Sequence, residues 1–352
     1  MKYGSKHEAK KWSMSKLGHG GLEATIPTPF TDDLKEINEK DLRAEVRYVI
    51  DTKNDGIFVL GNVGEFYSMS MAERKKVCEI VVDEAQGEIV VIMQTASHCA
   101  ADVIELSRHA EETGADLVAI LSPYFQTANL QAVEEWWHHV TDHFDIGAVF
   151  YDSPLSKLVT AQLLGQMSRE IPNICGVKDG RPDQMWCWEA EREANYEIWV
   201  SNPLEDHWPY EMRIMKNPTL CCAWHNWLLQ TPDYTPLRDY TDLIMAGKWE
   251  EGLDKYNEMA AGRQLLNEFF WHNYRKGVYV VAFWKYWFEL KGVITGHKVR
   301  TPLLNMTKEE EQWLKKRVEM LEAGTAPTGM AALETYPRQQ GGAEYAPGKI
   351  GI

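Results

Sequence analysis

The first two thirds of the chain alternate between short apolar runs and longer amphipathic segments. The short runs are bounded by Gly, Pro, Asn or other polar residues, which is typical of strands. Between them, apolar residues recur at spacings of three and four, which predicts helices. The predicted strands are 22–26, 56–60, 89–94, 117–121, 147–151, 173–178, 197–201 and 220–224, and the clearest helices between them are 39–52, 72–85, 101–113 and 130–143.

The order of these elements predicts an α/β fold with a parallel sheet. Most of the strands are apolar throughout rather than alternating, as expected where helices cover both faces of a sheet. Eight strand–helix units in about 230 residues favour a closed (β/α)8 TIM barrel over an open sheet. An open doubly wound sheet usually carries a glycine-rich phosphate turn after its first strand, whereas residues 27–30 read Pro-Thr-Pro-Phe.

Helical spacing continues without strands after the eighth predicted strand. It predicts helices over 240–246, 249–270, 277–291 and 308–322, and so a C-terminal helical extension of the barrel. The last residues are rich in Gly, Pro, Ala and polar side chains and are expected to be flexible. The predicted organisation is an N-terminal extension (1–20), the barrel (21–239), a helical region (240–323) and a flexible tail (324–352).

The charge balance excludes several classes of partner. The 352 residues include 52 acidic and 37 basic side chains, and the net charge of −15 argues against binding to nucleic acid or to an anionic membrane. No apolar run is long enough to span a bilayer, and the first twenty residues lack the apolar stretch of a secretory signal, so a cytoplasmic location is expected. The fourteen tryptophans either belong to the core, which is favoured, or line a site for a flat substrate.

Active sites of such barrels lie at the carboxyl ends of the strands, and two side chains stand out there. Lys178 ends the apolar run 174–177. A lysine drawn out of water has a lowered pKa, and its neutral amine can condense with a ketone to form a Schiff base. Tyr151 ends the neighbouring strand, where its phenol can move protons. The alternatives are a lysine held in a structural ion pair with Asp179 or another neighbour, and a tyrosine that belongs to the core.

A loop with two glycines follows the second predicted strand. Gly61 and Gly64 permit a tight turn whose backbone N–H groups can hold a carboxylate, and Glu65 either braces the loop or is solvated. His138 and His139 are adjacent on a predicted helix, where their side chains diverge by about a hundred degrees. A shared metal site is therefore not expected there.

Several motifs follow one another in a fixed order: Thr-Pro-Phe at 28–30, Gly-x-x-Gly-Glu at 61–65, Tyr-x-x-Pro at 151–154, Gly-x-Lys at 176–178, Arg-Thr-Pro-Leu-Leu at 300–304 and Thr-Lys-Glu-Glu at 307–310. With them the chain, from residue 22 to about residue 321, resembles the dihydrodipicolinate synthase and N-acetylneuraminate lyase family of class I pyruvate-dependent aldolases and dehydratases.

The resemblance implies a role for each motif. Lys178 would form the Schiff base, Tyr151 would shuttle protons, and the loop 61–65, chiefly Asn62 and Val63, would hold the carboxylate of a small-molecule 2-oxo acid. No metal or organic cofactor is needed, because the iminium that the lysine forms with the substrate serves as the electrophile. The family also implies a homo-oligomer, a tetramer built as a dimer of dimers.

The chain departs from the family at residues that bear on the substrate. The synthases typically carry two threonines where Asn62 and Val63 stand, a second tyrosine where Phe125 stands and an arginine where Ser156 stands. Because Val63 and Phe125 cannot carry protons, lysine biosynthesis is not expected. Trp224, at the end of the eighth strand, resembles the aldolases that cleave arylidene pyruvates, while the loop with Asn62 resembles members that dehydrate deoxy sugar acids.

The sequence therefore predicts a Schiff-base-forming lyase, an aldolase or dehydratase, with an aromatic and a deoxy sugar acid substrate both open. The alternatives are a condensation like that of 4-hydroxy-tetrahydrodipicolinate synthase and a catalytically silent barrel that binds a 2-oxo acid. The predicted catalytic residues are Lys178 and Tyr151, and the predicted substrate-binding residues are Gly61, Asn62, Val63, Gly64, Phe125 and Trp224.

Overall fold

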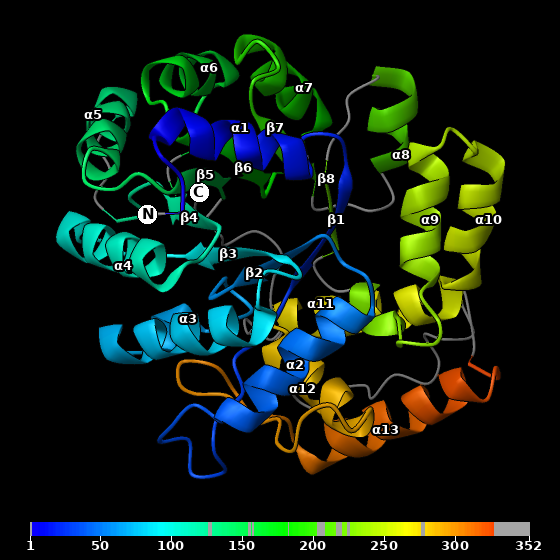
Figure 1. The fold of residues 1–352 in the computed structure, drawn as a ribbon. Coiled ribbons are helices and arrows are strands. Elements are labelled where there is room, and N and C mark those ends of the chain that lie inside the picture. The colour runs from blue at the N-terminus through cyan, green and yellow to red at the C-terminus, as the bar shows by residue number, and fades with distance from the viewer. Residues whose placement is uncertain are drawn as a thin grey trace.

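The computed structural model describes residues 2–125, 129–153, 156, 158–181, 183–202, 208–215, 220–223, 226–275 and 279–326. Eight parallel strands close into a barrel in the order β1 to β8, with helices around it (Figure 1). The predicted (β/α)8 barrel is confirmed. The strands are β1 (Gly21–Thr25), β2 (Gly56–Val59), β3 (Val90–Gln94), β4 (Leu117–Leu121), β5 (Gly147–Asp152), β6 (Ile174–Asp179), β7 (Trp199–Asn202) and β8 (Leu220–Ala223).

The strands and barrel helices follow from local sequence. Every residue of β1 to β6 is buried, because the strands pack against one another inside the barrel and against helices outside it. Helices begin at polar caps: Asn38 accepts a hydrogen bond from the Asp41 N–H, and Ser70 forms a capping box with Glu73. The helices that connect the strands of the barrel are α2 (Glu39–Asp51), η1 (Phe66–Ser68), α3 (Met71–Ala85), α4 (Ala100–Thr113), α5 (Leu130–Thr141), α6 (Ala161–Glu170), α7 (Gln184–Glu193), α8 (Trp208–Tyr210) and the π-helical turn η2 (Glu211–Met215).

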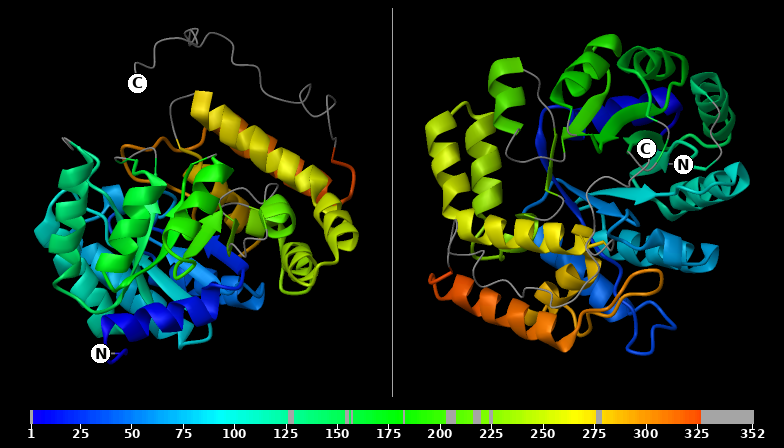
Figure 2. Two further views of the ribbon diagram at one scale, coloured as in Figure 1. Left: turned by 90° about the horizontal axis from the view of Figure 1, so that it is seen from above. Right: turned by 180° about the vertical axis from the view of Figure 1, so that it is seen from behind.

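An N-terminal helix, α1 (Lys6–Leu17), was not predicted from the sequence. It lies at the end of the barrel where β5 and β6 begin (Figure 2) and packs against these two strands, with Ala9 next to Gly147, the first residue of β5. Its buried side chains are small or few, namely Ala9, Ser13 and Leu17, so it shows almost no apolar stripe. The Ser13 hydroxyl accepts a hydrogen bond of 2.7 Å from the Trp199 indole. Tertiary contacts rather than an amphipathic pattern hold this helix.

Helices follow the barrel, as predicted. The single helix predicted over 249–270 is wrong, because α10 ends in a tight turn in which the Met259 N–H donates to the Tyr256 carbonyl, and a new helix starts at the next residue. Figure 2 shows α11 and α13 outside the barrel, and an ion pair of 3.3 Å between Arg317 and Glu268 joins them. The predicted tail from 327 onward lies outside the described residues. The helices that follow the barrel are η3 (Asn226–Leu229), α9 (Pro236–Met245), α10 (Trp249–Glu258), α11 (Ala260–Arg275), α12 (Val281–Leu290) and α13 (Lys308–Glu322).

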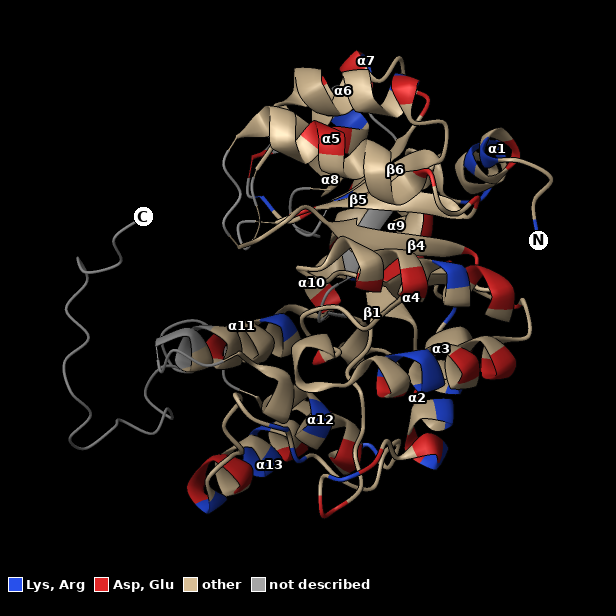
Figure 3. Cartoon of the chain, turned by 90° about the vertical axis from the view of Figure 1, so that its left-hand side faces the viewer, with Lys and Arg blue, Asp and Glu red and all other residues tan. Residues whose placement is uncertain are grey.

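Charged residues are concentrated on the helices around the barrel, where both signs are interspersed (Figure 3). Within the described part of the chain, no helix is long and apolar enough to cross a membrane. The eight strands carry four charged residues between them, each at most 7% exposed: Glu23, Asp152, Lys178 and Asp179. Burying charge is costly unless it is paired, so these four residues point to the functional part of the barrel.

Candidate active site

The register between β5 and β6 shows on which side of the barrel wall Asp152, Lys178 and Asp179 lie. Tyr151 is the partner of Lys178, and Asp152 is the partner of Asp179. Because successive side chains of a strand point to opposite faces, the first pair shares one side and the second pair the other. Lys178 contacts Glu23 of β1, which lies across the barrel, so the first pair faces the interior.

Lys178 is buried in the barrel and ion-paired. Its side chain is 8% exposed, and its Nζ donates a hydrogen bond of 2.8 Å to Oε1 of Glu23, a side chain with no exposed surface. The ring of Phe58 lies 4.4 Å from the same nitrogen. The sequence-based alternative of an ion pair with Asp179 is not what the structure shows, because Asp179 accepts hydrogen bonds from the Arg181 N–H and the Cys187 thiol instead.

Tyr151 lies beside Lys178 at the same level of the barrel. It is 9% exposed, and its ring packs edge-on against Phe58, with 5.8 Å between the ring centroids. The Asn62 side-chain N–H donates a hydrogen bond of 3.4 Å to the phenol oxygen. The structure thus brings together Lys178, Tyr151 and Asn62, which are far apart in the sequence.

The loop after β2 takes a conformation that requires its glycines. A Cβ on Gly64 would lie 2.8 Å from the Leu60 Cα, and one on Gly61 would lie 2.9 Å from the Phe58 ring. Leu60 and Glu65 adopt left-handed backbone angles with φ of 59° and 55°. The buried carboxylate of Glu65 braces the loop, as one of the two predicted alternatives had it, by pairing with Lys285 and accepting a hydrogen bond of 3.0 Å from a backbone N–H.

The remaining predicted substrate residues are placed differently. Val63 is 4% exposed and belongs to the core. Phe125, in the loop after β4, is 70% exposed, and its ring packs edge-on against His98 of the loop after β3. Trp224 lies outside the described residues. The structure therefore gathers Lys178, Tyr151 and the glycine loop, and does not bring Phe125 to them.

Sequence reasoning missed Glu23, Phe58 and Gln94. Glu23 was visible as a lone acid in an otherwise uncharged strand, where it alternates with Leu22 and Ala24. Phe58 gave no signal, because an aromatic residue in a buried strand is ordinary. Gln94 ends β3 and is 1% exposed, and neither polar atom of its amide has a hydrogen-bond partner among the described residues. Its oxygen would lie 3.7 Å from a Cβ on Gly61, so it adjoins the loop.

A second buried group lies behind the Lys178 strand. Burial raises the pKa of Asp179 to about 7, although the Cys187 thiol donates to its carboxylate at 2.9 Å. Burial also raises the pKa of Asp152, and its ion pair with Arg181 opposes that shift. The Arg181 guanidinium packs 4.1 Å from the Trp186 ring. This group supports β5 and β6 from outside the barrel.

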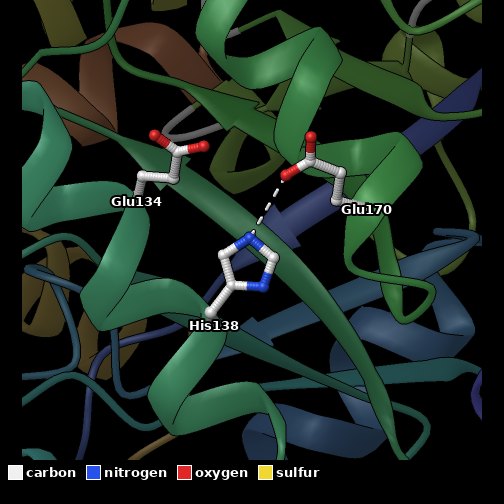
Figure 4. Close-up of side chains that lie close together, drawn as sticks. All are labelled: Glu134, His138 and Glu170. Atoms are coloured by element: carbon white, nitrogen blue, oxygen red, sulfur yellow. Dashed lines mark hydrogen bonds and ion pairs between the residues drawn. The ribbon is translucent and has the colours of Figure 1, made fainter.

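One cluster on the outer helices has residue types that could hold a metal ion. Glu134 and His138 on α5 face Glu170 on α6, and their ligand atoms lie within 4.8 Å of one another (Figure 4). His138 is within 3.3 Å of Glu170, and the Gln166 amide donates to both carboxylates. These groups satisfy one another on a partly exposed surface, which is an ordinary inter-helix network.

The family of the chain follows from its sequence as well as from this geometry. The family described as the dihydrodipicolinate synthetase family matches residues 19–214, more than half of the chain. The chain belongs to this family. A 4-hydroxy-tetrahydrodipicolinate synthase from Methanopyrus kandleri is 32% identical over 167 residues, which are 46% of this chain and 56% of that protein. The chain thus spans little more than half the length of the curated relatives that it matches.

Solved structures of the family share the fold over most of the chain. A prophage protein from E. coli K12, of the dihydrodipicolinic acid synthase family and in complex with pyruvate, gives a TM-score of 0.71 at 21% identity, covering 86% of this chain and 98% of its own. A sialic acid aldolase from Ruminococcus gnavus, a catalytic lysine mutant, gives 0.73 at 21% identity, covering 87% and 96%. At such identities the likeness shows the barrel and its C-terminal helices.

Proposed function

We propose that this member of the dihydrodipicolinate synthetase family is a lyase that forms a Schiff base between Lys178 and a 2-oxo acid. The observation that carries the proposal is the position of Lys178, a primary amine buried at the carboxyl end of β6 with Tyr151 as its neighbour on β5. Relatives by fold support it, since one of them holds pyruvate and another is a catalytic lysine mutant.

In the proposed reaction, the neutral Lys178 amine attacks the C2 carbonyl of the oxo acid, and loss of water leaves an iminium. The iminium withdraws electrons, so that a C–C or C–O bond beta to it can break, and hydrolysis then releases the product oxo acid. Tyr151 moves the protons, with its phenol oriented by the hydrogen bond from Asn62. Backbone N–H groups of the loop 61–64 hold the substrate carboxylate.

Cleavage or dehydration is favoured over condensation. The curated relatives include 4-hydroxy-tetrahydrodipicolinate synthases, so a condensation stays the alternative. However, Val63 is buried, Phe125 is largely exposed, and neither side chain has a hydroxyl, so neither can pass a proton to Tyr151. The proposed direction is therefore that of an aldolase or dehydratase.

Of the two predicted substrate classes, aromatic oxo acids and deoxy sugar acids, Gln94 favours the deoxy sugar acids, which carry hydroxyl groups. A buried amide without a partner costs free energy, which a bound ligand with hydrogen-bonding groups can recover. A deoxy sugar acid brings such groups, whereas an arylidene pyruvate brings an apolar ring. We therefore propose a deoxy sugar acid as the preferred substrate, with an aromatic one as the alternative.

The proposal is tested by trapping the Schiff base. The protein is incubated with pyruvate and borohydride, and intact-mass and peptide analysis are expected to place a reduced adduct on Lys178. Lys178→Ala should give no adduct and should lose measurable turnover with a panel of deoxy sugar acids and arylidene pyruvates. Tyr151→Phe should still form the adduct but turn over about 10²- to 10⁴-fold more slowly, because it removes the proton-transferring group.

Two outcomes would contradict this function. An adduct on Lys178 without turnover of any panel compound would show a silent barrel that only binds the oxo acid. Formation of product from pyruvate and the aldehyde substrate of the synthase, at a rate above that of any cleavage reaction, would favour the condensation. Lys75→Ala is a matched control, since Lys75 is a surface lysine paired with Glu105 on a neighbouring helix and should change neither adduct nor turnover.

A further inference from the structure

We infer that Glu23 is the counterion of the protonated Schiff base that Lys178 forms, an inference that rests on the proposed lysine chemistry. Oε1 of Glu23 lies 2.8 Å from the Lys178 Nζ, within a hydrogen bond of the reacting atom. The two residues are 155 positions apart, on β1 and β6, and their contact exists only because the sheet closes into a barrel.

The surroundings of the nitrogen suit a cation on both sides. The Glu23 carboxylate has no exposed surface, and the Ser201 hydroxyl donates a hydrogen bond of 3.4 Å to its second oxygen. The Phe58 ring lies 4.4 Å from the nitrogen, and an aromatic ring attracts a cation electrostatically. A carboxylate held inside the protein interacts more strongly with a charge than it would in water.

The charge balance of Schiff-base formation explains what such a carboxylate does. A lysine ammonium and a carbonyl group give an iminium and water: two of the three protons on nitrogen leave with the carbonyl oxygen, and one stays on the nitrogen. The nitrogen therefore carries one positive charge in the resting ammonium and again in the iminium, and Glu23 is paired with it in both states. Between them, one proton leaves the nitrogen so that the neutral amine can attack the carbonyl. A neutral imine would leave Glu23 as a buried anion without that cation, which is costly. Glu23 thus favours the protonated iminium, the form that withdraws electrons.

The other titratable groups near Lys178 are placed for different tasks. Tyr151, from β5, shares its side of the barrel wall and is hydrogen-bonded to Asn62. Asp179, on the same strand, points away and contacts Cys187 of α7, and Asp152 is paired with Arg181. Phe58 and Ser201, which contact Lys178 or Glu23 from β2 and β7, do not titrate. Among the described residues, Glu23 is the carboxylate in contact with the nitrogen.

The experiment measures how Schiff-base trapping depends on pH. Cyanoborohydride reduces the protonated iminium rather than the neutral imine, so the yield of reduced pyruvate adduct falls once the iminium loses its proton. In Glu23→Gln this fall is expected at a pH about one to three units lower than in the wild type, which is the size of effect an adjacent opposite charge has on a titrating group. Glu310→Gln is the matched control, because Glu310 is another buried acid, in the first turn of α13 and outside the site, and glutamine can still accept the hydrogen bond from the Thr307 N–H; the variant should keep the wild-type midpoint.

The results separate this inference from the proposed function. A midpoint in Glu23→Gln equal to that of the wild type overturns it, and so does an equal loss of adduct at every pH, which would mean that Glu23 only shapes the site. If the amide variant does not fold, Glu23→Leu tests the same shift with a side chain typical of the neighbouring strand positions. A wild-type protein that traps no pyruvate at Lys178 at any pH contradicts the proposed function instead.

Discussion

Two consecutive residues at the end of β6 have opposite environments. Lys178 faces the barrel interior and an acidic partner, whereas Asp179 faces α7 and the thiol of Cys187. Burial raises the pKa of Asp179 to about 7, so near neutral pH this carboxyl group takes up or releases a proton directly behind the lysine. Ionising Asp179 in the folded protein costs free energy, and this cost can be measured as a change in the free energy of unfolding when Asp179 is replaced.

Asp179→Asn is expected to reduce the pH dependence of the free energy of unfolding. In the unfolded chain Asp179 releases its proton near its ordinary pKa, about 4, whereas in the folded protein it holds the proton up to about pH 7. Between about pH 4 and about pH 7 the folded state therefore binds more protons than the unfolded state. The free energy of unfolding falls as pH rises through this window. Above the window the asparagine variant should be more stable by about 1 to 4 kcal/mol, and below the window equally stable.

Urea denaturation at several pH values measures this effect. Asp51→Asn, which makes the same substitution at an exposed aspartate of α2, is the control. Equal slopes for the wild type and Asp179→Asn between mildly acidic and neutral pH would contradict the raised pKa of Asp179.

At the scale of elements, one buried ion pair ties a C-terminal helix to the loop of the site. Lys285 of α12 has no exposed surface and pairs with Glu65, the residue that ends the glycine loop after β2. Its ammonium also donates a hydrogen bond of 3.2 Å to the Lys298 carbonyl and lies 4.5 Å from the Phe30 ring. The helical region thus determines the shape of the loop proposed to bind the carboxylate.

Lys285→Met is expected to destabilise the protein by about 3 to 5 kcal/mol, because it leaves Glu65 buried without its cation. The double variant Lys285→Met with Glu65→Gln should recover part of that loss, since no buried charge is then left unpaired. The surface pair of Lys75 and Glu105 is the comparison, and Lys75→Met should cost at most about 1 kcal/mol. Urea denaturation tests these values, and a loss for Lys285→Met as small as that for Lys75→Met would mean that the pair does not hold the loop.

At the scale of the whole molecule, we propose that the barrel assembles with copies of itself, as the resemblance to its family implies. Phe125, in the loop after β4, is 70% exposed, and Leu304, the last residue of the Arg-Thr-Pro-Leu-Leu motif, is 60% exposed. Large apolar side chains so exposed are more common at interfaces than elsewhere on a surface. The net charge of −15 argues against nucleic acid as the partner.

Sedimentation velocity at micromolar concentration is expected to show a homo-oligomer, with a tetramer as the predicted state. Phe125→Asp should shift the distribution toward smaller species if this face is buried between subunits. Glu112→Gln changes an acid in the part of α4 remote from the barrel mouth and serves as the control. A mass of one chain, 40.4 kDa, at every concentration would contradict the proposed assembly.

Much of the barrel could be predicted from local patterns. The strand 117–121 was predicted with its observed bounds, and Lys178 was singled out because it ends an apolar run. The helix α1 was missed because its buried side, Ala9, Ser13 and Leu17, is too small and polar to stand out. Helix α10 was merged with α11 because the apolar spacing continues through the turn at Met259.

The sequence alone therefore determined the eight strands, the barrel class and the residues at the strand ends, because the apolar run of a strand and the polar cap of a helix are local patterns of the chain. Only the tertiary structure decided what those residues meet. Glu23 contacts Lys178, and Lys285 contacts Glu65 across 220 positions, because closure of the sheet and docking of α12 bring distant segments together. A charge in the interior is stable only beside its partner, and no local pattern reveals which residue that partner is.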